Sequence, residues 1–298
     1  MKEMVLYYTI LLVLLLVTLC FFAILTLFAG RDFRDTFAGT PRCLCLYAYY
    51  EKNEHYRQNF IFFLQHGILP HVRYCIIVND STTTVSLPEL PNVTYLFRDN
   101  IGYDFGAWSH AIHSMADIHE FDFYFFMNTS VVGPILHGAT DWTRPFLALF
   151  DENTKLVGTS INIQKNLPPL TLYLREDKKH VSLMPHVQSM FFALDRDGFA
   201  FLYRSGFFAE EVTNKPFQEV IVTKEIGMSL RILDNGWNIN CLLPPYRGLD
   251  YRTLTADINP TSYNGDPYYT GAYFGQNIQP EQVIFYKNTR LDRPDGRV

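Results

Sequence analysis

Cysteine is scarce in this sequence of 298 residues: there are five, and no two of them stand in CxxC spacing. This excludes a disulfide-stabilised scaffold, and the absence of HExxH and His-x-His spacings argues against a structural zinc site. The GxGxxG and GxxxxGK[ST] fingerprints of phosphate-binding loops are missing as well. Long basic runs are also absent, and 25 Lys and Arg against 30 Asp and Glu give a net charge of −5. We therefore expect no nucleic-acid partner.

Apolar and aromatic side chains are plentiful instead. Hydrophobic residues make up 48% of the chain, aromatic residues 16% and charged residues only 18%. This balance excludes an intrinsically disordered chain, because there is ample apolar surface to bury. Beyond the first forty residues, the length fits one α/β domain or one domain with an extension.

The N-terminal segment differs from the rest of the sequence. No charged side chain occurs from Met4 to Gly30, a stretch of 27 residues. As a helix it would span about 40 Å, which exceeds the ~30 Å hydrocarbon core of a bilayer. It also exceeds the apolar region of a cleavable signal, which is about 7–15 residues long. We predict that residues 1–30 form a single-pass transmembrane signal anchor that crosses the lipid bilayer over residues 4–30; a cleaved signal is the alternative.

The sequence leaves both orientations in the membrane open. One positive side chain, Lys2, precedes the segment, and three follow it closely, at Arg31, Arg34 and Arg42. The positive-inside rule would keep the following domain in the cytosol. Three N-glycosylation triplets start at Asn79, Asn92 and Asn128. They would suit a lumenal domain, in the Golgi, the ER or another cellular membrane.

A polar linker over residues 31–42 leads into a domain over residues 43–298. Four apolar runs predict strands, at residues 43–50, 74–78, 93–97 and 121–127. Helical spacing predicts helices over residues 51–66 and 107–116, with a glycine-bearing loop at 100–106. Four β-then-α units in this order predict a mostly parallel sheet with helices on both faces.

Polar clusters follow three of the predicted strands, at residues 79–81, 100–104 and 128–130. Ligands of parallel sheets bind outside the carboxyl ends of the strands, so these clusters are candidates for one site. Each also has a local interpretation. Asp80 would form an Asx-turn, Asp104 would cap the next helix, and Asn128 would cap an ordinary turn.

Taken together, four stretches resemble one family: IIVNDST, RDNIGYDFGAWSHAI, FDFYFFMNTSVVGP and KEIGMSLRILDNGWNIN. Their order is similar to that of nucleotide-sugar glycosyltransferases of GT-A fold, including family-two members. In their residues, these stretches most resemble the rhamnan synthesis F-like glycosyltransferases. The resemblance covers about residues 43–290 and implies a GT-A, Rossmann-like domain after the N-terminal helix.

The resemblance also implies roles for particular residues. The nucleotide sugar would be bound by six of them: Asp80, Asn100, Gly102, Asp104, Asn128 and Ser130. Glu225 would be the general base of an inverting transfer, although a first-turn helix position favoured by the helix dipole would also suit a glutamate. The acceptor side would comprise Gln188, Ser189 and Trp237, the last of which could equally be a core residue.

One departure from the family concerns the metal. Asn128-Thr129-Ser130 stands where the family has Asp-x-Asp, and it contains no carboxylate, the ligand that hard cations prefer. Two alternatives follow. Mn²⁺ or Mg²⁺ would be held mainly by the donor diphosphate, or catalysis would need no metal and a cation such as Arg98, Lys287 or Arg290 would stabilise the leaving group.

We therefore expect a membrane-anchored hexosyl- or deoxyhexosyltransferase that acts on a glycan or glycoprotein, as in polysaccharide biosynthesis. The first alternative is an inactive carbohydrate-binding pseudo-transferase, which the missing Asp-x-Asp favours. The second is a glycoside hydrolase with Asp104 and Glu225 as its carboxylate pair. The tyrosine-rich stretch over residues 250–290 suits either carbohydrate binding or an aromatic core, and its residues 280–285 predict a turn into a strand.

Overall fold

The computed structural model describes residues 40–136, 138, 141–165, 183–209, 215–287 and 289. The chain divides between Pro41 and Arg42 into two units, and every helix and strand of the described residues lies in the second. The predicted anchor over residues 1–30 and most of the linker over residues 31–42 lie outside the described residues. Within the described residues, no helix combines the length and apolar character needed to cross a membrane.

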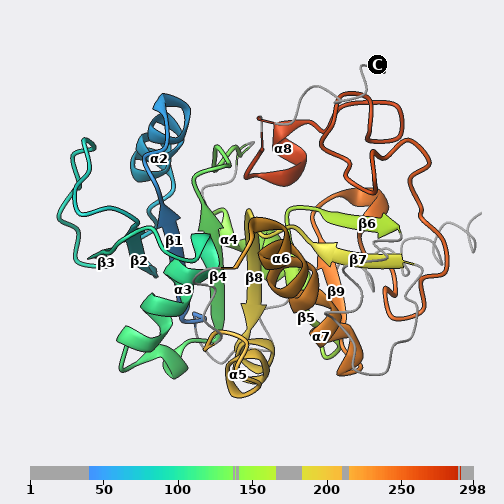
Figure 1. The fold of residues 1–298 in the computed structure, drawn as a ribbon, viewed down its shortest axis with the longest axis horizontal. Helices are drawn as coiled ribbons and strands as arrows, with labels where there is room; N and C mark the ends of the chain where they lie inside the picture. Colours follow the sequence, from blue (N-terminus) through green and yellow to red (C-terminus); the bar gives the residue numbers. More distant parts are fainter. Residues whose placement is uncertain are drawn as a thin grey trace, which may run out of the picture. The chain divides into compact units, whose positions relative to one another are not determined.

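The domain is built on a seven-stranded sheet in the order β3-β2-β1-β4-β8-β5-β9 (Figure 1). Strands β3, β2, β1 and β4 are parallel, β8 is antiparallel to both β4 and β5, and β9 is parallel to β5. The strands comprise β1 (Cys43–Tyr49), β2 (Val72–Val78), β3 (Val93–Phe97), β4 (Phe123–Asn128), β5 (Thr154–Gly158), β8 (Phe191–Asp195) and β9 (Asn238–Cys241). This confirms the predicted mixed α/β architecture with a mostly parallel central sheet.

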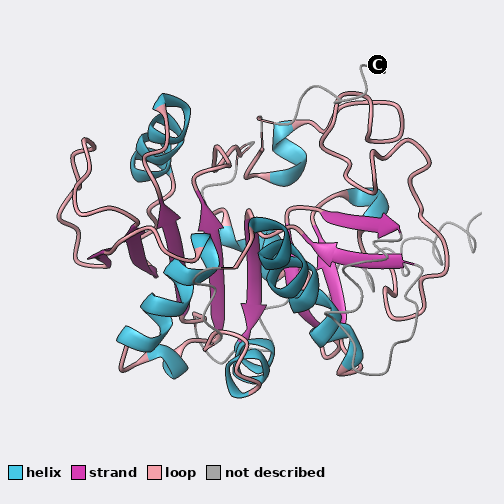
Figure 2. Cartoon of the chain, viewed as in Figure 1, coloured by secondary structure: helices cyan, strands magenta, loops and turns pink. Residues whose placement is uncertain are grey.

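Helices cover both faces of the sheet (Figure 2). On one face, Phe60 of α2 (Glu54–His66) stacks on Tyr49, with ring centroids 4.0 Å apart. On the same face, α4 (Thr143–Leu147) packs against Phe125. On the other face lie α3 (Tyr103–Ser114), whose Trp108 packs on Phe126, and α5 (Arg196–Arg204). Neighbouring residues of a strand point to opposite faces, which is why Phe125 and Phe126 meet different helices.

Two predictions about helices were wrong. Helix α3 begins at Tyr103 and not at Ala107, so Asp104 lies inside its first turn; the N-cap is Gly102. No helix lies between β2 and β3, where a β-then-α unit was expected. That connection contains three consecutive threonines and two prolines, residues that disfavour a helix through side-chain crowding and the missing amide hydrogen.

A second, smaller sheet and a long helical segment form the C-terminal side. The hairpin pairs β6 (Ile161–Lys165) with β7 (Leu183–Val187). Helix α6 (Phe217–Val220) continues through a π-helical segment, η4 (Ile221–Ile226), into α7 (Gly227–Asp234). Met184 of β7 packs with residues of η4 and α7 in one apolar cluster. The hairpin and the π-helical segment are therefore held together by a core of their own.

The remaining elements are short. They are η2 (Ile118–Glu120), η5 (Pro244–Tyr246) and α8 (Pro280–Val283). The predicted turn into a strand at residues 280–285 is instead this last helix, followed by an isolated bridge between Val132 and Tyr286. Residues 250–279 contain no strand or helix longer than a bridge.

Candidate active site

A cavity of about 500 Å³ opens at the carboxyl ends of β1 and β4. Its wall comes from segments far apart in the chain, namely Tyr50 and Lys52 after β1, Asn100 and the start of α3, residues 128–130 at the end of β4, Ser189 and Met190, the α6–η4 segment and Lys287. Exposed tyrosine and phenylalanine side chains stand beside lysines and carboxylates in this wall. We call it the large cavity.

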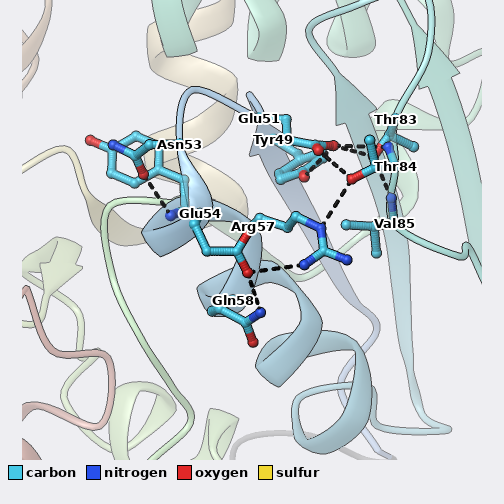
Figure 3. A network of polar contacts seen from close by, with 10 residues as sticks. Tyr49, Glu51, Asn53, Glu54, Arg57, Gln58, Thr83, Thr84 and Val85 are labelled. Carbon is cyan, nitrogen blue, oxygen red and sulfur yellow. Dashed lines mark hydrogen bonds and ion pairs between the residues drawn. The ribbon is translucent and has the colours of Figure 1, made fainter.

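The loop after β1 carries Tyr50 and Lys52 and is fixed by Glu51 (Figure 3). The Glu51 carboxylate accepts hydrogen bonds from Tyr49 Oη (2.9 Å), Thr83 Oγ1 (2.8 Å), Thr84 N (3.0 Å) and Thr84 Oγ1. Desolvation works against ionisation, but the hydrogen bonds from the two threonines prevail and lower the pKa of Glu51 to about 2. The charged carboxylate therefore ties the β1–α2 loop to the segment after β2.

The Asn-x-Gly loop brings the chain sharply into α3. Gly102 has φ 78°, which glycine adopts without steric cost. Tyr103 follows with φ 57°, which is rare for a residue with a side chain and is found at functional sites. Tyr103 is 41% exposed, and its ring packs against that of Phe217, a residue 55% exposed, at 5.3 Å between centroids. Two uncovered aromatic rings thus lie in the wall of the large cavity.

A carboxylate does stand beside the Asn128 triplet, but it comes from α3. Asn128 Nδ2 donates to Asp104 Oδ2 at 2.6 Å, and Asn128 Oδ1 accepts from Ser130 N and Oγ. Burial raises the pKa of Asp104 to about 6; the hydrogen bond from Asn128 and the charge of Lys287 oppose this shift, and the charge of Glu225 adds to it. The Asp104 carboxyl group therefore interacts electrostatically with both Lys287 and Glu225.

Glu225 lies on the π-helical segment η4, a kind of helix often found at functional sites. Its Oε2 accepts hydrogen bonds from Ser189 N at 3.0 Å and from Ser189 Oγ. Its Oε1 lies 3.8 Å from Nε2 of the buried His186. Nδ1 of His186 is 2.9 Å from the carbonyl oxygen of Met184 and donates to it, since a carbonyl can only accept. One oxygen of Glu225 is thus fixed, and the other faces an imidazole nitrogen.

A second cavity of about 220 Å³ adjoins the first. It is enclosed by the β6–β7 hairpin, by residues 218–225 and by the loop at residues 263–269. Ile221 and Glu225 line both cavities. The π-helical segment therefore separates the two cavities, and its single carboxylate, Glu225, borders both of them. We call this second space the small cavity.

Most of the predicted site residues meet in the large cavity, namely Asn100, Asp104, Asn128, Ser130, Ser189 and Glu225. Gly102 shapes the loop beside it. Three others line neither cavity. Asp80 is exposed and accepts from Ser81 N at 2.6 Å, Gln188 is buried and accepts from Ser160 Oγ, and Trp237 packs edge-on against Phe201.

Several wall residues were not foreseen. Tyr50 and Lys52 directly follow the first strand, so the rule of ligands at strand ends could have found them. Tyr103 and Phe217 gave no such signal, because exposed aromatic residues cannot be told from core residues in the sequence. Of the three cations expected at the leaving group, Lys287 lines the large cavity. Arg98 instead donates to Asn79 Oδ1 and to the carbonyl of Ile101, and Arg290 lies outside the described residues.

The large cavity offers little to a divalent ion. In the described part of the chain, no three His, Cys, Asp or Glu side chains gather closely enough to bind one. Asp104 already accepts a hydrogen bond, and the amide oxygen of Asn128 is occupied by Ser130. Hard cations take six or more oxygen ligands, so the protein side chains alone do not fit such an ion.

Comparisons with known proteins identify a family and structures to which the chain is similar. A family model described as rhamnan synthesis protein F matches residues 75–266. A comparison with curated proteins gave no match. One similar solved structure is the mannosyltransferase PcManGT from Pyrobaculum calidifontis in complex with GDP-Man and Mn²⁺, at 11% identity and a TM-score of 0.43, with 68% of this chain and 55% of that chain covered. Another is the apo bifunctional glycosyltransferase WbbM, at 12% identity and a TM-score of 0.34, with 69% and 39% covered.

Proposed function

The chain belongs to the rhamnan synthesis protein F family, and from this premise we propose that it is a glycosyltransferase that uses a nucleotide-sugar donor. One observation carries the proposal: a fixed carboxylate, Glu225, stands between two cavities. A transferase must hold two substrates on either side of one reacting centre. A simple binding module has no need of a second substrate space beside a carboxylate.

The large cavity suits the donor. A flat nucleobase would lie against the exposed rings of Tyr103 and Phe217, because aromatic faces stack on bases of any kind. Lys52 and Lys287 supply positive charge for the diphosphate. Asn100 and Asp104 offer polar atoms to the ribose and the sugar. The wall therefore has aromatic rings for the base, lysines for the diphosphate, and polar atoms for the ribose and the sugar.

Glu225 would act as the general base of an inverting transfer. Its open oxygen, Oε1, takes the proton from the acceptor hydroxyl as that oxygen forms a bond to the anomeric carbon of the sugar. The bond from the anomeric carbon to the phosphate oxygen breaks, and its electron pair leaves with the nucleotide. The lysines stabilise the negative charge that grows on the departing phosphate oxygen.

A metal ion has no step in this mechanism, because the side chains of the large cavity that the structure describes do not form a site for one. A divalent ion carried in by the donor would meet one carboxylate, Asp104, and neutralise diphosphate charge. The two lysines supply the same charge without it, so we propose that metal is dispensable.

The wider setting is proposed on the sequence alone. Residues 1–30 would anchor the chain in the Golgi, the ER or another cellular membrane, residues 31–42 would link the anchor to the domain, and residues 43–298 would form the transferase domain. The transferred unit would be a hexose or deoxyhexose, and the acceptor a glycan or glycoprotein.

Nucleotide release tests the proposal. The full chain, purified in detergent, is mixed with UDP-, GDP- and dTDP-sugars and an acceptor extract, with Mn²⁺ or with EDTA, and free nucleotide is measured. We expect release with one donor class in both arms, loss of release in Glu225→Gln, and no loss in the matched variant Glu152→Gln at an exposed position. Silence with every donor, together with no thermal shift by any nucleotide, would contradict a transferase and favour the pseudo-transferase.

A further inference from the structure

Resting on the proposed transferase, we propose that the small cavity binds the acceptor, and that this acceptor is the terminal unit of an uncharged glycan. The cavity, at about 220 Å³, has room for one sugar ring rather than for an extended chain. It shares Glu225 with the donor side, so a hydroxyl of that ring would lie beside the base.

A preorganised turn builds one wall of the small cavity. Tyr263 and Asp266 exchange backbone hydrogen bonds of 3.1 and 2.9 Å across a two-residue turn. Asn264 and Gly265 at its tip have φ 50° and 84°, the pattern of a type I′ hairpin turn. The backbone amide of Ile163 in β6 donates to Gly265 O at 3.2 Å. The turn is thus fastened to the β6–β7 hairpin before any ligand binds.

The polar groups of the small cavity are mostly neutral. Three amide side chains, from Asn162, Gln164 and Gln218, line it, and among the described residues of its wall there is no lysine or arginine. Amides both donate and accept, which matches sugar hydroxyl groups. The acidic side chain that this wall shares with the large cavity, Glu225, would repel a carboxylate or phosphate on the ligand. The wall therefore favours neutral sugars over uronic acids and phosphorylated sugars.

Asn162 is an incompletely paired amide in this wall. The residue is nine-tenths buried, and its Oδ1 has no hydrogen-bond partner among the residues that the structure describes. Buried polar atoms are nearly always paired, because an unpaired one costs free energy. The oxygen is closed off from solvent and lies against the Gly265 turn, so a sugar hydroxyl reaches it only if the amide or the turn shifts.

Two tyrosines supply an apolar surface next to the amides. The rings of Tyr263 and Tyr269 lie 4.8 Å apart with an angle of 59° between their planes, and both are half-buried. The faces of aromatic rings carry partial negative charge and attract C–H groups with partial positive charge. A sugar ring presents such a C–H face together with hydroxyl groups at its edge. In this wall, the tyrosine rings would contact the C–H face and the amides would bind the hydroxyl groups.

The position of Glu225 fixes which of its oxygens serves the acceptor. Oε2 is held by Ser189, so Oε1, next to His186, is the oxygen open to a second group. His186 lines the small cavity and is held by Met184 O, so it cannot turn away. The acceptor hydroxyl would therefore be delivered to Oε1 from the side of the small cavity.

Acceptor kinetics test this assignment in the full-length chain. The probes are methyl glycosides of neutral hexoses and 6-deoxyhexoses, and of hexuronic acids as the charged comparison, with the active donor at saturation. The variants Gln164→Leu and Tyr269→Ala alter the small cavity, and Gln276→Leu, at an exposed position outside both cavities, is the matched control for the first.

We expect transfer to at least one neutral glycoside and none to the uronides. The two cavity variants should raise the acceptor KM at least tenfold, while the donor KM and the thermal shift by the nucleotide stay at the wild-type values. Unchanged acceptor KM in both variants would overturn the assignment, and so would preferred transfer to uronides. A wild-type chain that binds no nucleotide sugar would instead overturn the proposed function, which the nucleotide thermal shift detects separately.

Discussion

The two walls that meet at Glu225 are built in different ways. The donor wall is the edge of a parallel sheet, where the ends of β1 and β4 and the start of α3 set the side chains. The acceptor wall is made of a hairpin, a π-helical segment and a turn from residues 263–266, none of which belongs to that sheet. The donor wall rests on a seven-stranded sheet, whereas the acceptor wall rests on a two-stranded sheet and on the local hydrogen bonds of a helical segment and a turn.

This difference suggests a division of tasks. The sheet edge is a general platform for nucleotides, because base, ribose and phosphate are shared by many donors. The irregular wall is free to vary with the acceptor, since a changed turn or hairpin leaves the sheet intact. Substitutions in the two walls test this division, and the expected effect decreases from Glu225, which both walls share, to Asp104.

Glu225→Gln removes the one carboxylate in the lining of both cavities. We expect transfer to fall by about 10²–10⁴, because an amide cannot accept the proton of the acceptor hydroxyl. Donor affinity should stay within about twofold, since Ser189 can still donate to the amide oxygen. Single-turnover rates and nucleotide binding by calorimetry would measure the two effects. Equal loss of both would mean that Glu225 belongs to the donor wall alone.

Gly265→Ala tests how tightly the turn at residues 263–266 of the acceptor wall packs against β6. A Cβ there would lie 2.3 Å from Ile163 O, whereas one at Gly275 would meet nothing within 4 Å, although both residues have φ near 80°. We expect Gly275→Ala to cost about 1 kcal/mol from backbone strain, and Gly265→Ala to cost a further ~1–3 kcal/mol from the clash.

Urea unfolding of the two alanine variants measures this difference, and acceptor and donor KM values show which wall responds. The acceptor KM should rise in Gly265→Ala alone. Equal unfolding free energies in the two variants would mean that the turn is not held against β6.

Replacing the lysines tests the donor wall. Lys52→Met and Lys287→Met should each weaken donor affinity by about tenfold to a hundredfold, the range expected for a hydrogen bond to a charged group. Lys165→Met, which removes a lysine outside both cavities, is the control. Activity lost in EDTA but unaffected by both substitutions would show that a metal ion, and not the lysines, carries the charge.

Asp104→Asn should produce the smallest effect, visible in the pH dependence of stability. Because the pKa of Asp104 is raised to about 6 in the fold, the native state holds its proton more tightly than the unfolded chain does. The stabilisation of the fold by this tighter proton binding is fully present below about pH 4 and is lost as the pH rises through 6. We expect about 1 kcal/mol, since water screens a partly exposed carboxyl.

The melting temperatures of the wild type and Asp104→Asn, compared between pH 4 and 7, give the measurement. The wild type should lose stability relative to the variant across this range. A difference that does not change with pH would contradict the raised pKa.

Local sequence pattern was enough to predict the first half of the central sheet, β1 to β4, but not β5 to β9. Apolar runs and helical spacing identified the parallel strands and most of α2, because local side-chain pattern and burial on a sheet go together. The same reasoning brought Asn100, Asp104 and Asn128 to one edge, since the carboxyl ends of neighbouring parallel strands lie side by side. Glu225 came from the family resemblance and not from any pattern.

The rest depends on contacts between distant segments, which the folded chain alone establishes. The carboxylate missing from the Asn128 triplet is supplied by Asp104, 24 positions earlier in the chain, through a contact that no local pattern encodes. The small cavity brings together Asn162, His186 and Tyr269, which are separated by unrelated segments. Such long-range contacts depend on how the hairpin, the π-helical segment and the loops pack together, and packing is a property of the whole fold rather than of any stretch of sequence.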